Sequence, residues 1–225
     1  MKRRAFFLAL ATAAAVVWGS GATNEARAAG VPLSTVLGTT QSFGGLNFTF
    51  PSLANNGYST VNGPAADQVN IVFQTVTGPG GVTEIGFELQ APFGAQAGQR
   101  ADSALNYTVT ATDGLRISDA LLTANPFTTG SGFGSVTELF NGTTIIGVQS
   151  PAPLTTTFNF NPTLTTLTVA KDIEANAIGS SAPVSLSLVG QYFSVVPEPA
   201  SMSLLGIGMA GLLAFRRYFK RAATV

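Results

Sequence analysis

A stretch in the middle of the chain restricts the fold more than any other feature. Leu105, Tyr107 and Val109 alternate with small polar residues, so a strand here would have one apolar face. Asp113-Gly114 follows, and the apolar alternation then resumes. Both residues of an Asp-Gly pair tolerate positive φ, which a two-residue hairpin turn requires. This stretch therefore predicts a β-hairpin.

The same arrangement recurs along the chain. Asn141-Gly142 separates two further strand-like runs, and the GPGG sequence at 78–81 separates another two. Later strand-like runs cover Leu164–Val169 and Val184–Val195, and nothing in 29–195 shows sustained helical periodicity. Short strands at turn-marked spacing are typical of a β-sandwich. We therefore expect an all-β fold, with one β-sandwich ectodomain over 29–195.

The alternation also predicts which side chains face inward. Between 84 and 89 the apolar residues are expected to face in, and Glu84 and Glu88 to face out. Most phenylalanines fit inward positions and are more simply core residues than a ligand platform. The expected core comprises Phe48, Phe50, Ile71, Phe73, Ile85, Phe87, Tyr107, Ile117, Ile145, Val169, Leu186 and Leu188.

The first part of the sequence reads as an export signal. Met1–Arg4 is basic, Ala5–Gly19 is apolar, and the small residues Ala26 and Ala28 suit cleavage after Ala28. Residues 1–28 therefore predict a signal-peptide helix, handled by the secretory translocon and signal peptidase. The two adjacent arginines also fit the loose twin-arginine pattern, but the general secretory route is favoured because nothing downstream suggests a cofactor.

The other basic segment follows a short apolar run. Residues 200–215 carry no charge and would form a helix of about 24 Å, somewhat short of a ~30 Å hydrocarbon core. Four basic residues occur within 216–221, and positive charge of this kind is retained in the cytoplasm. Pro197 and Pro199 favour an extended backbone before the helix. We expect a transmembrane helix with its motif exposed on the outer side.

Together these residues resemble a known family signal. Val196–Pro199, a short glycine-containing helix and then Arg216-Arg217 look like the PEP-CTERM sorting signal of Gram-negative bacteria. The resemblance covers 196–221. It implies that the membrane protease-transpeptidase exosortase recognises Pro197, Glu198 and Pro199, while Arg216 and Arg217 stop transfer. It also implies an inner-membrane tether before processing, delivery to the cell surface or extracellular matrix, and an association with exopolysaccharide.

Composition limits the chemistry. The chain has no cysteine and no histidine, which removes thiol nucleophiles, disulfides and the commonest general base and metal ligand. Residues 29–199 contain three basic and ten acidic residues, a net charge of −7. No basic patch is therefore available for nucleic acid. We expect no cofactor.

The acidic residues leave two alternatives open. Glu84 and Glu88 would lie about 13 Å apart on a strand, beyond the roughly 5–9.5 Å of paired catalytic carboxylates, whereas Asp172 and Glu174 would lie near ~7 Å. An acidic pair near a strand end is more often a solvated edge. Loops could also bring scattered aspartates together around calcium; these are Asp67, Asp102, Asp113 and Asp119.

Three Asn-x-Thr sequences match the glycosylation pattern, but strand or turn roles explain them more simply; they begin at Asn47, Asn106 and Asn141. The leading hypothesis is a non-enzymatic, exported structural or interaction protein. A secreted binding module for carbohydrate or exopolysaccharide is second, and a carboxylate-based hydrolase is third.

Overall fold

A computed structural model of the chain shows two β-sheets and few helical residues, which confirms the predicted all-β sandwich. The structure describes residues 30–150, 154–198, 204, 207–213 and 215. The predicted signal peptide with Ala26 and Ala28 lies outside these residues, as do Pro199, Arg216 and Arg217, so those predictions stay predictions.

The elements follow one another with short connections. In chain order they are β1 (Val31–Pro32), α1 (Leu33–Val36), β2 (Thr40–Phe43), β3 (Leu46–Thr49), the 3₁₀ turn η1 (Leu53–Asn55), β4 (Tyr58–Val61), β5 (Asn70–Thr77), the 3₁₀ turn η2 (Pro79–Gly81), β6 (Thr83–Ala95), β7 (Arg100–Ala111), β8 (Leu115–Thr128), β9 (Phe133–Phe140), β10 (Thr144–Gln149), β11 (Thr155–Leu164), β12 (Thr166–Asn176) and β13 (Val184–Pro197).

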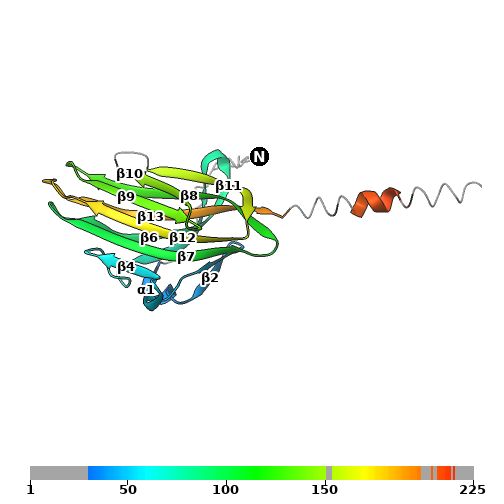
Figure 1. The fold of residues 1–225 in the computed structure, drawn as a ribbon, viewed down its shortest axis with the longest axis horizontal. Helices are drawn as coiled ribbons and strands as arrows, with labels where there is room; N and C mark the ends of the chain where they lie inside the picture. Colours follow the sequence, from blue (N-terminus) through cyan, green and yellow to red (C-terminus); the bar gives the residue numbers. More distant parts are fainter. Residues whose placement is uncertain (1–29, 151–153, 199–203, 205–206, 214, 216–225) are drawn as a thin grey trace, which may run out of the picture.

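The strands form two layers (Figure 1). The six-stranded sheet has the order β1-β5-β6-β13-β8-β11, and the seven-stranded sheet has the order β10-β9-β12-β7-β3-β2, with β4 also pairing with β7. Every pairing between strands is antiparallel. The last strand, β13, lies at the centre of its sheet between β6 and β8.

Two of the three predicted hairpins are confirmed, because β5 pairs with β6 and β9 pairs with β10. The hairpin at Asp113-Gly114 is wrong: the turn forms, with φ of 56° and 71°, but it leads from β7 in the seven-stranded sheet to β8 in the six-stranded sheet. A turn sequence specifies that the chain reverses and not which strands then pair. Asn141 and Gly142 have φ of 49° and 71° in the β9–β10 turn, and Pro79–Gly81 of the GPGG sequence forms η2 between β5 and β6. The run Leu164–Val169 is not one strand, because β11 ends at Leu164 and β12 begins at Thr166.

Packed aromatic rings occupy the space between the sheets. Phe48 and Phe87 meet with ring centroids 5.7 Å apart, and Phe87 and Tyr107 with centroids 5.2 Å apart. Such edge-on contacts add to the free energy gained by burial. The predicted core residues that are fully buried are Phe48, Phe50, Ile71, Phe87, Tyr107, Ile117, Val169 and Leu186. Phe73 and Ile85 pack against this core, and Leu188 is half-buried.

Ile145 was wrongly placed in the core. It is 67% exposed, and Ile146 and Val148 of β10 are buried instead. The β9–β10 turn pairs Phe140 with Thr144, and this register sends the even-numbered residues inward. A one-residue difference in register moves every side chain of a strand to the opposite face.

The C-terminal apolar run is described only in part. Leu204, residues 207–213 and Phe215 are helical (Figure 1). Their large apolar side chains are exposed. No helix among the residues described is both long and apolar enough to span a bilayer. The transmembrane helix expected over 200–215 therefore stays a prediction.

Candidate functional site

The predicted recognition motif begins inside the sheet rather than on a linker. Strand β13 continues to Pro197, and Val196 and Pro197 pair with Arg116 and Leu115 of β8. The Glu198 amide then donates a 2.7 Å hydrogen bond to the Gly114 carbonyl in the β7–β8 turn. The first part of the motif is thus held against β8 and the Asp113-Gly114 turn that joins the two sheets.

Arg116 holds the side chain of Glu198 at this end. Its Nη1 lies 3.2 Å from Glu198 Oε1. Its Nε and Nη2 donate to Oγ1 and the carbonyl of Thr163, at 3.0 and 2.8 Å. Both ionic partners are partly exposed, so the pair is worth at most about 1 kcal/mol. Arg116 thus orients the Glu198 side chain, but the weak ion pair can be broken easily.

The exposure expected of the motif is present in part. Val196, Pro197 and Glu198 are exposed, yet two of the three are paired to β8. A protease that binds Val196 and Pro197 as extended backbone would first have to separate these two residues of β13 from β8. That separation breaks few hydrogen bonds, because Pro197 has no N–H to donate.

The acids Glu84 and Glu88 do not form a pair. Both point away from Phe87, as predicted, but they are only 2% and 8% exposed, so the expectation that they face solvent is wrong. Part of the reason is the β5–β6 turn: a Cβ on Gly78 would lie 2.6 Å from Glu84 Cγ, so this glycine packs directly on the glutamate. Glu88 Oε1 accepts a 2.6 Å hydrogen bond from Gln90.

The structure brings Glu84 next to Asp119 of β8 instead. Burial, followed by the charge of Asp119 and a hydrogen bond to it, raises the pKa of Glu84 to about 7. When ionised, Glu84 has one buried oxygen, Oε2, without a partner. Two carboxyls in contact leave no space for the water or sugar that the separated acids of a glycosidase hold between them.

Two serine hydroxyls form a hydrogen-bonded network with Asp119 across β8 and β13. Ser194 Oγ donates to Asp119 Oδ2, the Ser194 amide lies 3.2 Å from Asp119 Oδ1, and Ser118 Oγ is 2.6 Å from Ser194 Oγ. Asp119 therefore contacts both Ser194 of β13 and Glu84, the carboxyl group whose pKa is raised.

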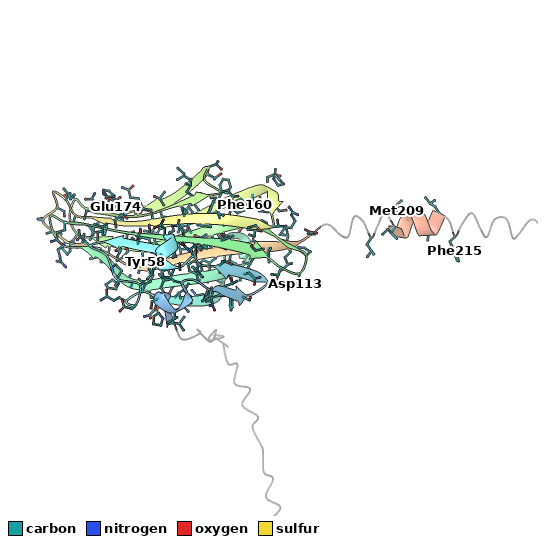
Figure 2. All side chains as sticks on the ribbon, turned by 60° about the horizontal axis from the view of Figure 1, so that its bottom comes forward. Tyr58, Asp113, Phe160, Glu174, Met209 and Phe215 are labelled. Atoms are coloured by element: carbon teal, nitrogen blue, oxygen red, sulfur yellow. The ribbon has the colours of Figure 1, made fainter. Side chains whose placement is uncertain are left out.

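The second acidic pair belongs to an ionic cluster at the opposite end. Arg100 contacts Asp102 at 2.9 Å and Glu174 at 2.8 Å. Partial burial and a hydrogen bond to Asp102 raise the pKa of Asp172 to about 6. Figure 2 shows Glu174 and Asp113 toward opposite ends of the sandwich. Asp172 and Glu174 thus lie near one end of β12 among other charged side chains, and β12 is an inner strand of its sheet rather than an edge strand.

The aspartates considered for calcium are far apart in the fold. Asp102 belongs to the Arg100 cluster, Asp119 pairs with Glu84, and Asp113 lies in the β7–β8 turn. Across 30–150, 154–198 and the described helical residues, no group of three acidic side chains is placed to hold a metal ion. Asn47, Asn106 and Asn141 occupy strands or turns, as expected.

A hollow of about 300 Å³ lies near the motif end, between the β9–β10 turn and β11. Phe140, Phe158 and Phe160 form its aromatic wall, with ring centroids 5.2 to 6.2 Å apart. Pro162 and Leu164 add further apolar surface, and amides and hydroxyls line the hollow from Asn141, Thr143, Thr144, Asn159 and Asn161. Phe160 lies toward the end at which β13 leaves the sandwich (Figure 2).

A family model described as the PEP-CTERM protein-sorting motif matches residues 195–217. Residues 195–217 are a PEP-CTERM sorting motif. The match begins within β13 and covers Pro197 and Glu198, the residues held by β8 and the β7–β8 turn. A PEP-CTERM motif indicates an exported protein that exosortase processes.

Comparison with curated proteins finds no match. Two solved structures are similar at 10% sequence identity. One is TmCBM61 in complex with β-1,4-galactotriose, with a TM-score of 0.29 over 63% of this chain and 88% of that chain. The other is the family 11 carbohydrate-binding module from Clostridium thermocellum in complex with a β-1,3-1,4-mixed-linked tetrasaccharide, with a TM-score of 0.20 over 63% and 91%. Likenesses at these scores carry no argument about this chain.

Sequence reasoning missed the role of Arg116 beside the PEP-CTERM motif. The sequence does single out Arg116, since only three basic residues occur in 29–199 and Arg116 lies close after the Asp113-Gly114 turn. Its partner could not be predicted, because the pairing of β8 with β13 joins residues about eighty positions apart.

Proposed function

We propose that this protein is a non-enzymatic structural or interaction protein of the cell surface or extracellular matrix, delivered by export and by exosortase processing at Pro197-Glu198-Pro199. The apolar run over 200–215 tethers it in the inner membrane until processing, with Arg216 and Arg217 on the cytoplasmic side. The β-sandwich is the part that reaches the outside.

One observation carries this proposal: the PEP-CTERM motif starts where the last strand of the sandwich ends. Nothing but the motif separates the folded domain from the apolar run, so the anchored sandwich sits directly at the membrane surface. Exposed apolar side chains on the described part of the run, such as Leu204 and Leu212, require an apolar environment that the sandwich does not supply.

Replacing Glu198 by alanine tests recognition. We expect the full chain to accumulate in the membrane fraction of cells that contain exosortase, with at least a tenfold loss of the surface form. Immunoblots of membrane and surface fractions measure this, beside a strain without exosortase, in which the wild-type chain should give the same pattern. The matched control is Glu174→Ala, which removes a comparable arginine–glutamate pair at the other end.

A further variant separates recognition from docking. Arg116→Ala releases the Glu198 side chain but leaves the motif intact, so processing should continue at least as fast as in the wild type. If Arg116→Ala and Glu198→Ala block processing equally, the fold of this end and not the motif would explain the loss. Normal surface delivery of Glu198→Ala would refute the proposed recognition.

A second candidate function, carbohydrate binding by the exported sandwich, is favoured by the aromatic hollow. Sugar rings stack on aromatic faces while amides and hydroxyls hydrogen-bond to them, and the Phe140–Phe158–Phe160 hollow has both kinds of group. The ligand would be exopolysaccharide at the cell surface.

Replacing Phe160 by alanine should then weaken binding of the protein to purified exopolysaccharide by about tenfold or more, the loss expected for one stacking ring. Pull-down or calorimetric titration measures the affinity. Phe127→Ala is the matched control, because Phe127 is 65% exposed and does not line the hollow. Equal affinities for the three proteins would remove this candidate.

A further inference from the structure

Three polar side chains meet in the middle of the hydrophobic core. Lys171 of β12 and Glu138 of β9 are cross-strand neighbours in the seven-stranded sheet. Gln191 of β13 faces them from the six-stranded sheet. The side chains of Lys171 and Glu138 are 0% exposed, and Gln191 is 0% exposed as a residue.

The Lys171 ammonium nitrogen contacts both of the other side chains. Lys171 Nζ donates to Glu138 Oε1 and lies 3.2 Å from Gln191 Oε1. Three neighbouring buried atoms have no hydrogen-bond partner: Glu138 Oε2, Gln191 Nε2 and the hydroxyl of Tyr107. A cluster kept only for stability would be a poor solution, since each unsatisfied buried polar group costs about 1–3 kcal/mol.

Burial changes the preferred charge state of the pair. Desolvation lowers the pKa of the Lys171 ammonium and raises the pKa of the Glu138 carboxyl. Both effects favour transfer of a proton from Lys171 to Glu138. The product is a neutral amine, which is nucleophilic, in contact with a neutral acid and with a carboxamide.

We propose that Lys171 and Gln191 form an intramolecular amide cross-link between the two sheets, with Glu138 as the catalytic acid and base. The Lys171 amine attacks Gln191 Cδ, forming the Nζ–Cδ bond. Neutral Glu138 supplies its proton to Nε2 and then, as a carboxylate, accepts a proton from Nζ, and the Cδ–Nε2 bond breaks. One ammonia leaves, Glu138 is regenerated, and no oxidant or reductant takes part.

Gln191 rather than Glu138 is the acyl partner on chemical grounds. If Gln191 reacts, the unsatisfied Nε2 departs as ammonia and Glu138 remains beside Nζ to carry the protons. If Glu138 reacted, the remaining group at Nζ would be the Gln191 amide, which cannot take up or release protons at neutral pH. The reaction with Gln191 also joins the two sheets, which the cysteine-free chain cannot do with disulfides.

Peptide mass spectrometry of the exported full chain, unfolded before digestion, tests this proposal. Cleavage after glutamate separates residues 139–174 from 175–198, and the cross-link would hold these two peptides together. We expect one joined species, lighter than the sum of its parts by one ammonia. Trypsin should fail to cut after Lys171 in the same sample, because an acylated lysine is no longer charged.

Two variants assign the roles. Glu138→Gln keeps the shape of the side chain but cannot carry protons, so its peptides should separate; circular dichroism reports whether this variant folds. Glu88→Gln changes another buried glutamate and should retain the cross-link. Separate peptides from the wild-type chain would overturn the proposal, whatever the variants do. A fragment of residues 89–174 that is uncut after Glu138 and lighter by one water would also overturn it, since that loss places the bond on Glu138.

Discussion

Replacing Glu138 by alanine is expected to lower the free energy of unfolding by about 3–5 kcal/mol, because it leaves the buried Lys171 without the carboxyl group that it contacts. Lys171 is fully buried and donates to Glu138 and Gln191. Without the carboxylate, an ammonium at this depth must either remain charged in an apolar environment or lose its proton. Denaturant titration followed by circular dichroism measures the change.

The matched comparison is the double variant Lys171→Met/Glu138→Leu. It removes both buried ionisable groups and keeps side chains of similar volume, so it should be more stable than Glu138→Ala alone. Any cross-link at Lys171 is lost in both proteins, so the comparison isolates the cost of the unpaired lysine. If the double variant proved less stable than the single one, the pair would not be the reason for the loss.

Replacing Glu84 by glutamine is expected to stabilise the protein above neutral pH. The pKa of this carboxyl is raised from 4.5 to about 7 in the folded protein, so folding favours its protonated form. The associated stability is complete below pH 4.5 and is lost as the pH rises through about 7. A difference of this size corresponds to roughly 3 kcal/mol. Glutamine keeps a donor toward Asp119 and cannot ionise.

Denaturant titrations at a series of pH values between 4 and 8 measure this effect. The wild-type protein should lose stability across the range, and Glu84→Gln should lose much less. Asp119→Asn removes the neighbouring charge and should reduce the slope in part, because the larger cause, burial, remains. Asp172 contributes a slope of the same sign up to about pH 6, and this slope remains in both variants. Identical slopes in all three proteins would contradict the account of Glu84.

Local patterns predicted the turns, two of the three hairpins and most of the core. The Asp113-Gly114 turn instead carries the chain from one sheet to the other, because strand pairing depends on residues far away in the sequence. The alternation around Tyr107 and the positive φ demanded of Asp113 and Gly114 depend on neighbouring residues only, so the sequence contains what is needed to place them. Ile145 was misplaced because the register of β10 depends on how the turn closes, which the Asn-Gly pair does not specify by itself.

Pairs between distant strands could not be predicted. Glu84 of β6 and Asp119 of β8 come together because both strands pair with β13. The alternation of apolar and polar residues does not predict this strand order. The buried cluster left a visible signal, however. Lys171 follows Val169 and precedes Ile173 in the inward phase of β12, and Glu138 precedes Phe140 in the inward phase of β9. A charged residue in an apolar phase indicates a buried polar site.

The mass of the C-terminus of the surface-exposed protein tests the central claim most directly. If exosortase processes the chain at its PEP-CTERM motif, the surface fraction should contain molecules that end near Pro197-Glu198-Pro199 and lack Arg216 and Arg217. The same fraction from cells without exosortase should contain little of the protein. Surface molecules that still extend to Val225 would contradict the account.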